Sequence, residues 1–232
     1  MTIVDRFNAS PLEALLWALA LLISVVLHEY GHAWVAIWQG DDTPTKNGRF
    51  DWNPARYLDW TGILLFLLIG FGALGYVKTQ PWKYRNPVWG SFAVSMAGIV
   101  MNIGLVLMAA TLLRTLETRV LPFGLDLERS LGNAAMVGGV AYTSSLAPGW
   151  VLYFLAQLLS LNVILAVFNA LPVPPLDGAN ALAAIVPGSL GASLRAHLNQ
   201  SWWLLFIVII FLREPLGHLI FTVQSWVLNL LF

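Results

Sequence analysis

The sequence predicts an all-α polytopic membrane protein with about five to six membrane helices and a small membrane-associated re-entrant or β segment. The first observation behind this prediction is composition, since 58% of the 232 residues are hydrophobic and only 10% are charged. Soluble domains carry roughly 25% charged residues and must cover their surface with polar groups, so a lipid bilayer is the expected solvent. The second observation is the alternation of long uncharged runs with short polar connections. The formal net charge is +0 and cysteine is absent, so neither a surface for nucleic acid nor a disulfide is expected.

The first half of the chain predicts one long helix followed by an irregular region. A capping serine and a proline, Ser10 and Pro11, are typical of a helix start, and the apolar run continues to about Trp38. Residues 43–59 are polar and rich in turn formers, so short strands or loops are expected there. Residues 61–76 are apolar and glycine-containing but short for ~30 Å of hydrocarbon, which favours a re-entrant or partly embedded segment.

The second half predicts two further spans and a C-terminal pair of apolar runs. Residues 88–113 and 150–170 carry no charge, and the intervening Gly-, Ser- and Ala-rich stretch 130–149 is expected to be a surface helix or loop. Prolines end the span at 172–175, and a short helix to Val186 follows. The runs 201–212 and 215–232 fit either two helices or one kinked hairpin. We predict a single membrane-embedded domain over 1–232, with a core at about 12–186 and C-terminal helices at about 193–232.

A zinc-binding pattern lies inside the first predicted helix, at His28, Glu29 and His32. In this H-E-x-x-H pattern the two histidines lie one turn apart on the same helix face, where both can bind one zinc ion and the glutamate can act as general base. A chance match with solvent-facing side chains is the alternative. However, ionisable groups within a spanning helix cost several kcal/mol and are rare without a function. The pattern therefore predicts a zinc centre here.

A catalytic zinc site needs a third protein ligand and one open position. His197 and His218 lie near predicted helix ends, where interfacial histidines are common. Asp177 follows a spanning helix directly, within proline-rich backbone that is tolerated at membrane depth only where it lines protein or a wet cavity. From spacing alone, a ligand and a turn aspartate that caps the next helix are equally favoured for this residue.

These two motifs together resemble the site-2 protease family of intramembrane zinc metalloproteases. That family pairs H-E-x-x-H on one transmembrane helix with N-x-x-P-x-x-x-L-D-G on another. The second motif is matched here at Asn169, Pro172, Leu176, Asp177 and Gly178. Residues 48–54 and 59–62 look like the family's membrane-embedded β segment, and Ala97, Gly98 and Asn102 look like its A-G-P-x-x-N helix, with Ile99 in place of proline. The resemblance covers about residues 15–185 and is to the compact form without a PDZ or nucleotide-sensing domain.

The resemblance implies a site and a reaction. Asp177 becomes the third ligand of one Zn²⁺ per chain, and Asn169 and Asn102 are expected to help hold the substrate carbonyl or the oxyanion. The implied substrate is a single-span membrane protein cleaved in regulated intramembrane proteolysis. Extended segments around 50–52 and 77–79 could receive the unwound substrate by β-addition, although ordinary polar loops explain them nearly as well.

Two functions of other classes remain open. A catalytically inactive membrane scaffold would keep the fold, but the intact Glu29 and its neighbouring histidines argue against it. A metal transporter needs polar residues along successive helices, whereas residues 88–113 offer only Ser, Asn and Thr. A serine protease is disfavoured because no serine lies in a G-x-S-x-G turn. The oligomeric state is left open.

The distribution of basic residues predicts the orientation in the membrane. Residues 39–87 contain Lys46, Arg49, Arg56, Lys78, Lys83 and Arg85, whereas residues 114–129 contain only Arg114, Arg119 and Arg129. Because cytoplasmic loops carry an excess of Lys and Arg, residues 39–87 are expected on the cytoplasmic side. The active site would then lie nearer the cytoplasmic side of a bacterial or archaeal cell membrane.

Overall fold

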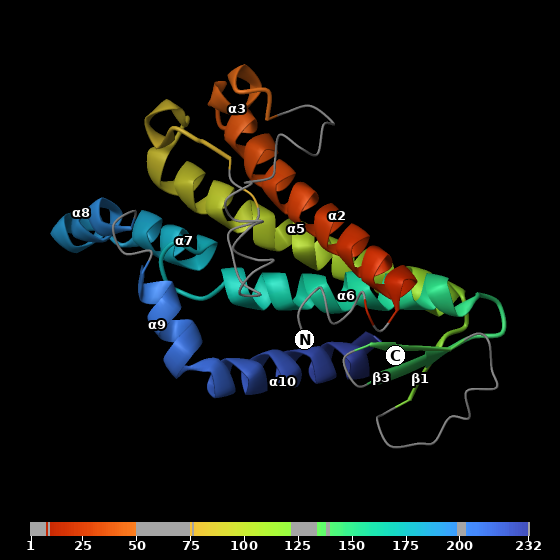
Figure 1. Cartoon of the computed structure of the whole chain (residues 1–232). Coiled ribbons are helices and arrows are strands. Elements are labelled where there is room, and N and C mark those ends of the chain that lie inside the picture. Colours follow the sequence, from red (N-terminus) through yellow and green to blue (C-terminus); the bar gives the residue numbers. More distant parts are fainter. Residues whose placement is uncertain are drawn as a thin grey trace.

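The computed structural model describes residues 8, 10–49, 75, 77–121, 134–137, 140–198 and 203–231. Three long helices form its body, namely α2 (Pro11–Trp38), α5 (Pro87–Thr115) and α6 (Gly149–Asn169) (Figure 1). Within the described residues these 3 helices are long and apolar enough to cross a membrane, and the bent pair α9 (Trp203–Phe211) and α10 (Arg213–Leu231) adds up to one more. The all-α polytopic membrane fold is therefore confirmed, and the described part of the chain accounts for three or four of the expected spans.

Proline-based start signals position the first two spans. Ser10 caps α2, its Oγ accepting a hydrogen bond from the backbone N–H of Glu13, and Pro11 is the first helical residue. Asn86 caps α5 in the same way, and its Oδ1 accepts from two backbone N–H groups at 3.1 Å each. Both helices begin with a proline because the missing N–H of the first turn has no intrahelical partner in any case. The predicted boundaries of the three long spans agree with the structure to within two residues at every end.

Small residues let the spanning helices approach closely. Ala20, Ala109 and Ala156 are fully buried between α2, α5 and α6. Gly31 lies where a Cβ atom would come within 2.5 Å of Met101 Cγ on α5. In lipid, helices associate through such close packing rather than through the hydrophobic effect, so these positions hold the bundle together.

The described strands lie in the second half of the chain, where no strand was expected. A three-stranded antiparallel sheet of order β1-β3-β2 is formed by β1 (Arg119–Leu121), β2 (Ala134–Val137) and β3 (Val140–Thr143). Two of these strands fall in the stretch expected to be a surface helix or loop, where Val140, Tyr142 and Thr143 supply β-branched and aromatic side chains. Buried Tyr142 and Val137 join the sheet to the core between α2 and α6. The expected β segment and the expected re-entrant segment 61–76 lie almost entirely outside the described residues, which omit 50–74 and 76.

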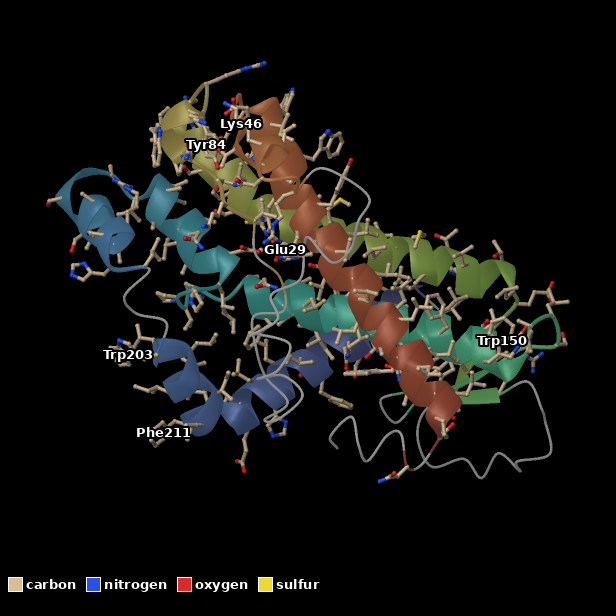
Figure 2. The ribbon with its side chains drawn as sticks, turned by 45° about the horizontal axis from the view of Figure 1, so that its top comes forward. Glu29, Lys46, Tyr84, Trp150, Trp203 and Phe211 are labelled. Atoms are coloured by element: carbon tan, nitrogen blue, oxygen red, sulfur yellow. The ribbon has the colours of Figure 1, made fainter. Side chains whose placement is uncertain are left out.

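The remaining elements lie at the ends of the bundle. Helix α3 (Thr43–Lys46) has a proline at its second residue. It occupies the start of the segment 43–59, which was expected to form strands or loops, so that expectation is wrong for these four residues. The 3₁₀ turn η2 (Pro81–Lys83) lies beside it. Helices α7 (Asp177–Ile185) and α8 (Gly188–His197) follow α6. Figure 2 shows Lys46 and Tyr84 at one end of the bundle and Trp150 at the other, with Glu29 between them.

Candidate metal centre

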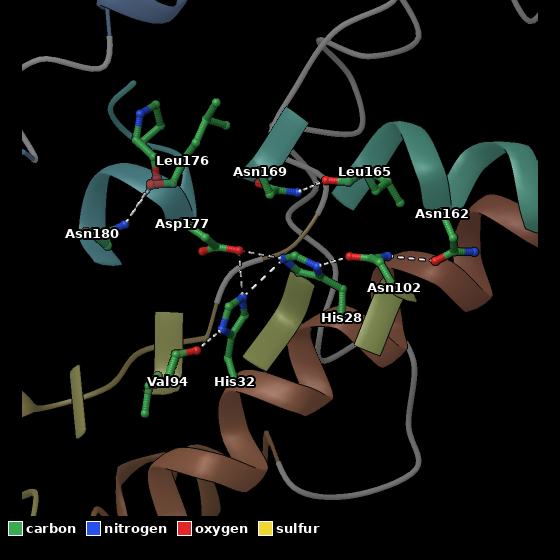
Figure 3. A network of polar contacts seen from close by, with 11 residues as sticks. His28, His32, Val94, Asn102, Asn162, Leu165, Asn169, Leu176, Asp177 and Asn180 are labelled. Atoms are coloured by element: carbon green, nitrogen blue, oxygen red, sulfur yellow. Dashed lines mark hydrogen bonds and ion pairs between the residues drawn. The ribbon is translucent and has the colours of Figure 1, made fainter. Parts of the chain in front are cut away.

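Three side chains that the sequence singled out converge inside the bundle (Figure 3). His28 and His32, one turn apart on α2, are both less than a tenth exposed, and their Nε2 atoms lie 3.1 Å apart. The Oδ2 atom of Asp177 lies 3.1 Å from Nε2 of His28 and 3.2 Å from Nε2 of His32. Among the described residues, these three form the one group of His, Cys, Asp or Glu side chains arranged to hold a metal ion.

The hydrogen bond that Nδ1 of each histidine makes on its far side leaves Nε2 facing the cluster. Nδ1 of His28 lies 2.5 Å from Oδ1 of Asn102, and Nδ1 of His32 lies 2.6 Å from the carbonyl oxygen of Val94. Both partners are acceptors, so Nδ1 carries the proton and the lone pair of the neutral ring is on Nε2. Two lone pairs and a carboxylate oxygen therefore point at one another, and Oδ2 of Asp177 is buried without a hydrogen-bond partner.

The surroundings leave space for an ion beside these atoms. Gly98 of α5 lies opposite the histidines, and a Cβ atom on it would come within 2.5 Å of His32 Nε2 and 2.6 Å of His28 Nε2. A methyl group at this position would thus occupy the space next to the ligand atoms. Two imidazole nitrogens and one carboxylate oxygen are a donor set that Zn²⁺ prefers in catalytic sites. The residues therefore fit a zinc ion.

The chain returns sharply after α6 to bring Asp177 to the histidines. Helix α6 ends at Asn169, and the proline-containing turn leads directly into α7, whose first residue is Asp177. A Cβ atom on Gly178 would collide with the carbonyl oxygens of Ala170 and Leu171, so only glycine permits this close return. Leu176 is the N-cap of α7 and no side chain caps the helix. The alternative interpretation of Asp177 as a helix cap is therefore wrong.

Glu29 lies next to the cluster on the same helix turn and is 8% exposed. The backbone at Gly75 packs directly against it, because a Cβ atom there would lie 2.6 Å from Cγ and 2.8 Å from Oε1 of Glu29. The backbone at Gly75 therefore covers the carboxylate that the H-E-x-x-H pattern assigns as general base.

The two asparagines differ in position. Asn102 is fully buried, accepts from His28 through Oδ1, and donates through Nδ2 to Oδ1 of Asn162 at 2.7 Å. Both of its polar groups are thus engaged inside the protein, which disfavours the expected contact with a substrate carbonyl and favours a role in holding His28. Asn169 donates to the carbonyl of Leu165, one turn back on α6, and not to a ligand of the cluster (Figure 3). Its expected contact with the substrate stays a prediction.

Sequence reasoning missed two contributors to the centre. Asn162 lies in the uncharged span α6, and a polar amide in such a span is a signal that could have identified it. The carbonyl of Val94 leaves no signal in the sequence, because every residue carries one. Of the other two candidate histidines, His197 hydrogen-bonds the carbonyl of Ser193 within α8 and His218 lies in α10. Neither belongs to the cluster.

The fold and the cluster define an integral membrane metalloprotein with an H-E-x-x-H helix. The chain matches the model of peptidase family M50 over residues 16–213 and belongs to this family, the site-2 protease family.

Several bacterial proteins are similar over most of the chain. The "Putative zinc metalloprotease YwhC" of Bacillus subtilis is 32% identical over 216 residues, which cover 92% of this chain and 88% of that protein. The "Putative zinc metalloprotease Rip2" of Mycobacterium tuberculosis is 29% identical over 218 residues, covering 90% of this chain and 71% of that protein. A third relative, "Putative zinc metalloprotease sll0528" of Synechocystis, is 30% identical over 172 residues, covering 74% of this chain and 31% of that protein. No solved structure matches the chain significantly. The relatives and the donor set identify zinc as the cofactor.

Proposed function

We propose that this chain is an intramembrane zinc endopeptidase that hydrolyses a peptide bond within or near a transmembrane segment of a membrane-anchored protein. The observation that carries this proposal is the convergence of His28, His32 and Asp177 beside Glu29, inside a bundle of membrane-spanning helices. A soluble peptide substrate would not need a site at this depth, whereas a single-span membrane protein can reach it from the lipid.

The roles of the side chains follow from their positions. His28, His32 and Asp177 would hold the zinc ion, which when bound polarises a substrate carbonyl and lowers the pKa of water to about 7. The Glu29 carboxylate, one residue from His28 on α2, accepts the proton of the attacking water and passes it to the leaving amine. The surrounding apolar helices exclude bulk water and so strengthen the electrostatic interactions at the reacting atoms.

The position of the centre along α2 supports a location nearer the cytoplasmic side. His28 and His32 lie in the second half of α2, toward the end where Lys46 and Lys83 both pair with Asp42. Positively charged ends of membrane helices face the cytoplasm. A substrate would therefore be cut near its cytoplasmic membrane boundary.

The inactive scaffold and the metal transporter fit less well. A scaffold has no need for three converging ligands with an adjacent buried carboxylate. A transporter requires an open polar path, but the buried polar side chains Ser24, Asn102 and Asn162 of the described helices are hydrogen-bonded to one another. Both functions nevertheless remain outcomes of the test below.

Glu29→Gln isolates the chemical step. The amide cannot accept the proton of the attacking water, while both histidines and Asp177 are unchanged. In liposomes that contain a single-span substrate, cleavage should fall by at least ~100-fold, the usual loss when general acid–base catalysis is removed. Zinc content and thermal stability should stay at the parent level.

The same vesicles distinguish the three functions. A folded, zinc-loaded Glu29→Gln protein that cleaves at the parent rate would contradict the assigned role of Glu29. Zinc uptake into vesicles without any cleavage would support a transporter. Neither cleavage nor uptake by the parent protein, over a panel of single-span substrates, would support a scaffold.

A further inference from the structure

A continuous chain of hydrogen bonds leads away from the metal centre and connects the spanning helices α2, α5 and α6. From His28 Nδ1 it passes to Oδ1 of Asn102 on α5, then from Nδ2 of Asn102 to Oδ1 of Asn162 on α6 at 2.7 Å. Nδ2 of Asn162 continues it to Oγ of Ser24 on α2 at 2.8 Å. Asn102, Asn162 and Ser24 are fully buried. We call these three residues the asparagine relay.

The backbone fixes the direction of every donor in the relay. Nδ2 of Asn162 also donates to the carbonyl of Leu158 at 2.7 Å, and the Ser24 hydroxyl donates to the carbonyl of Ala20 at 2.7 Å. Carbonyl oxygens only accept hydrogen bonds, so the amide nitrogen of Asn162 must face Leu158 and Ser24. A flipped Asn162 would place two oxygens against each other and leave buried groups unpaired, which is costly in an apolar interior. Oδ1 of Asn162 therefore faces α5.

The orientation of the Asn162 amide determines, through Asn102, which atom faces Nδ1 of His28. Because Asn162 presents an acceptor, Asn102 must present its Nδ2 to it and turn its Oδ1 toward His28. An oxygen at that position requires the proton of the neutral imidazole to be on Nδ1, which leaves the lone pair on Nε2. We propose that Asn162, acting through Asn102, sets the tautomer and ring orientation of His28 and thereby keeps Nε2 available to the zinc ion. Both asparagines are positioning residues.

The two histidine ligands differ in the group that accepts the hydrogen bond from Nδ1. Nδ1 of His32 bonds directly to the carbonyl of Val94, which is part of helix α5 and always accepts. His28 depends instead on two amide side chains, each of which could be inserted either way round. A change at Asn162 should therefore weaken zinc binding through His28 alone, although the hydrogen bonds of Asn162 go to Asn102, Ser24 and Leu158 and not to a histidine. The inference rests on the metal centre and does not depend on the proposed protease activity.

Substitutions at Asn162 separate a positioning role from a packing role. Asn162→Leu removes the acceptor for Asn102 Nδ2, so Asn102 can turn over and His28 can place its proton on Nε2. Zinc affinity, measured by competition with a chelator on purified protein, should fall by about 10–100-fold, as for other partners of metal-bound histidines. Asn162→Asp in its neutral form keeps an acceptor for Asn102 and a donor for the Leu158 carbonyl. This variant should bind zinc close to the parent affinity.

A matched control removes a similar contact elsewhere on α6. Gln224 of α10 donates to Oγ of Ser160 at 2.9 Å, and this pair is separate from the relay. Gln224→Leu should lower thermal stability and leave zinc affinity unchanged. If Asn162→Leu also leaves zinc affinity unchanged, Asn162 does not set the tautomer and orientation of His28. The same conclusion follows if Asn162→Asp loses as much zinc affinity as Asn162→Leu.

A direct measurement needs no substitution. The chain has only 4 histidines, so nitrogen-15 NMR of imidazole-labelled, zinc-free protein can resolve the protonated and unprotonated ring nitrogens of each. His28 should show one tautomer with the proton on Nδ1. A parent protein in which His28 carries its proton mainly on Nε2 would overturn the proposal, whatever the outcome of the cleavage assays.

Discussion

At the scale of single residues, Gly98 is expected to be essential for zinc binding because it has no Cβ atom. Gly98 places hydrogen where any other residue would place a carbon within 2.6 Å of both ligand nitrogens. Gly98→Ala should therefore remove the stoichiometric zinc. The fold should survive, because alanine in a helix interior is favoured over glycine by about 1 kcal/mol. Metal analysis together with thermal unfolding of the purified protein checks both expectations.

The same helix supplies the control for this change. Gly104 is also on α5, and a Cβ atom there would meet nothing within 4 Å. Gly104→Ala should retain full zinc and a stability at least equal to that of the parent. Full zinc occupancy in a folded Gly98→Ala protein would mean that the ion lies elsewhere than between Gly98 and the histidines.

The sequence predicted the metal ligands, but it did not predict the residues that hydrogen-bond and orient them. The spacing of His28 and His32 is a local property of one helix, so it predicts a shared face without further information. Asp177 comes from a distant turn, and only the family resemblance distinguished a ligand from a cap. The partners of an amide such as Asn102 depend on which helices pack against it, so its role could not be read from the sequence. Asn162 was missed for the same reason.

At the scale of elements, a buried carboxylate joins the end of α2 to residues 77–83, which precede α5. Asp41 is fully buried, and its Oδ1 accepts from the backbone N–H of Thr43 at 2.9 Å. Its Oδ2 accepts from the backbone N–H of Gln80 at 2.6 Å. The sequence indicated only a helix end at this position. Asp41 thus fixes both α3 and the segment 77–83 relative to α2.

Asp41→Ala should loosen this segment. The buried backbone N–H of Thr43 and the partly buried N–H of Gln80 lose their acceptor. A fully buried group left unsatisfied costs about 1–3 kcal/mol. Hydrogen exchange of residues 77–83 should accelerate. Cleavage activity should also fall, because Val77 of this segment packs against Ala33, the residue after His32 on α2. Unchanged exchange in these residues would show that other contacts hold the segment.

The neighbouring aspartate provides the comparison. Asp42 is exposed, and hydrogen bonds from Lys46 and Lys83 lower the pKa of its carboxyl to about 2. The lowered pKa means that the stabilisation is complete above the ordinary value of 3.8 and is lost only as the pH falls toward 2. Asp42→Ala therefore removes a solvent-exposed pair at neutral pH, and exchange in residues 77–83 should change much less than in Asp41→Ala.

Helices and strands were predictable to different degrees. Each long span is predicted by its own predominantly apolar run, and α2 and α5 also begin with a capping serine or asparagine followed by a proline. The sheet depends on pairing between β1 and β3, which are far apart in sequence and only three and four residues long. Such short strands carry little local signal, because packing against the core and pairing with neighbours stabilise them.

At the scale of the whole molecule, the bundle presents the surface of a membrane protein. Helix α5 exposes Val100, Ile103 and Leu107 along one face, each about half exposed, and these positions are three to seven residues apart. Exposed tryptophans lie near the ends of the spans, among them Trp34 and Trp38 on α2 and Trp150 on α6. Apolar faces between such aromatic ends are typical of helices that cross a bilayer.

The start of α5 lies beside the end of α2. The backbone N–H of Arg85 donates to the carbonyl of Gln39 at 2.7 Å, and Lys83 pairs with Asp42 at 2.7 Å. Residues 39 and 85 are therefore at the same end of the bundle, so the chain between them begins and ends on one side of the membrane. The basic residues of this segment, including Lys46, Lys78 and Arg85, then favour that side as cytoplasmic.

Cysteine labelling tests this orientation directly, because the native chain contains no cysteine. Lys78 is exposed at the α3 end, and Ser145 is exposed at the opposite end, just before α6. In intact cells, a membrane-impermeant thiol reagent should label Ser145→Cys and leave Lys78→Cys unlabelled until the membrane is opened. The reverse pattern would place the metal centre nearer the outer side. In that case the substrate would be cut near its extracytoplasmic boundary, while the zinc ligands and the role of Glu29 would be unaffected.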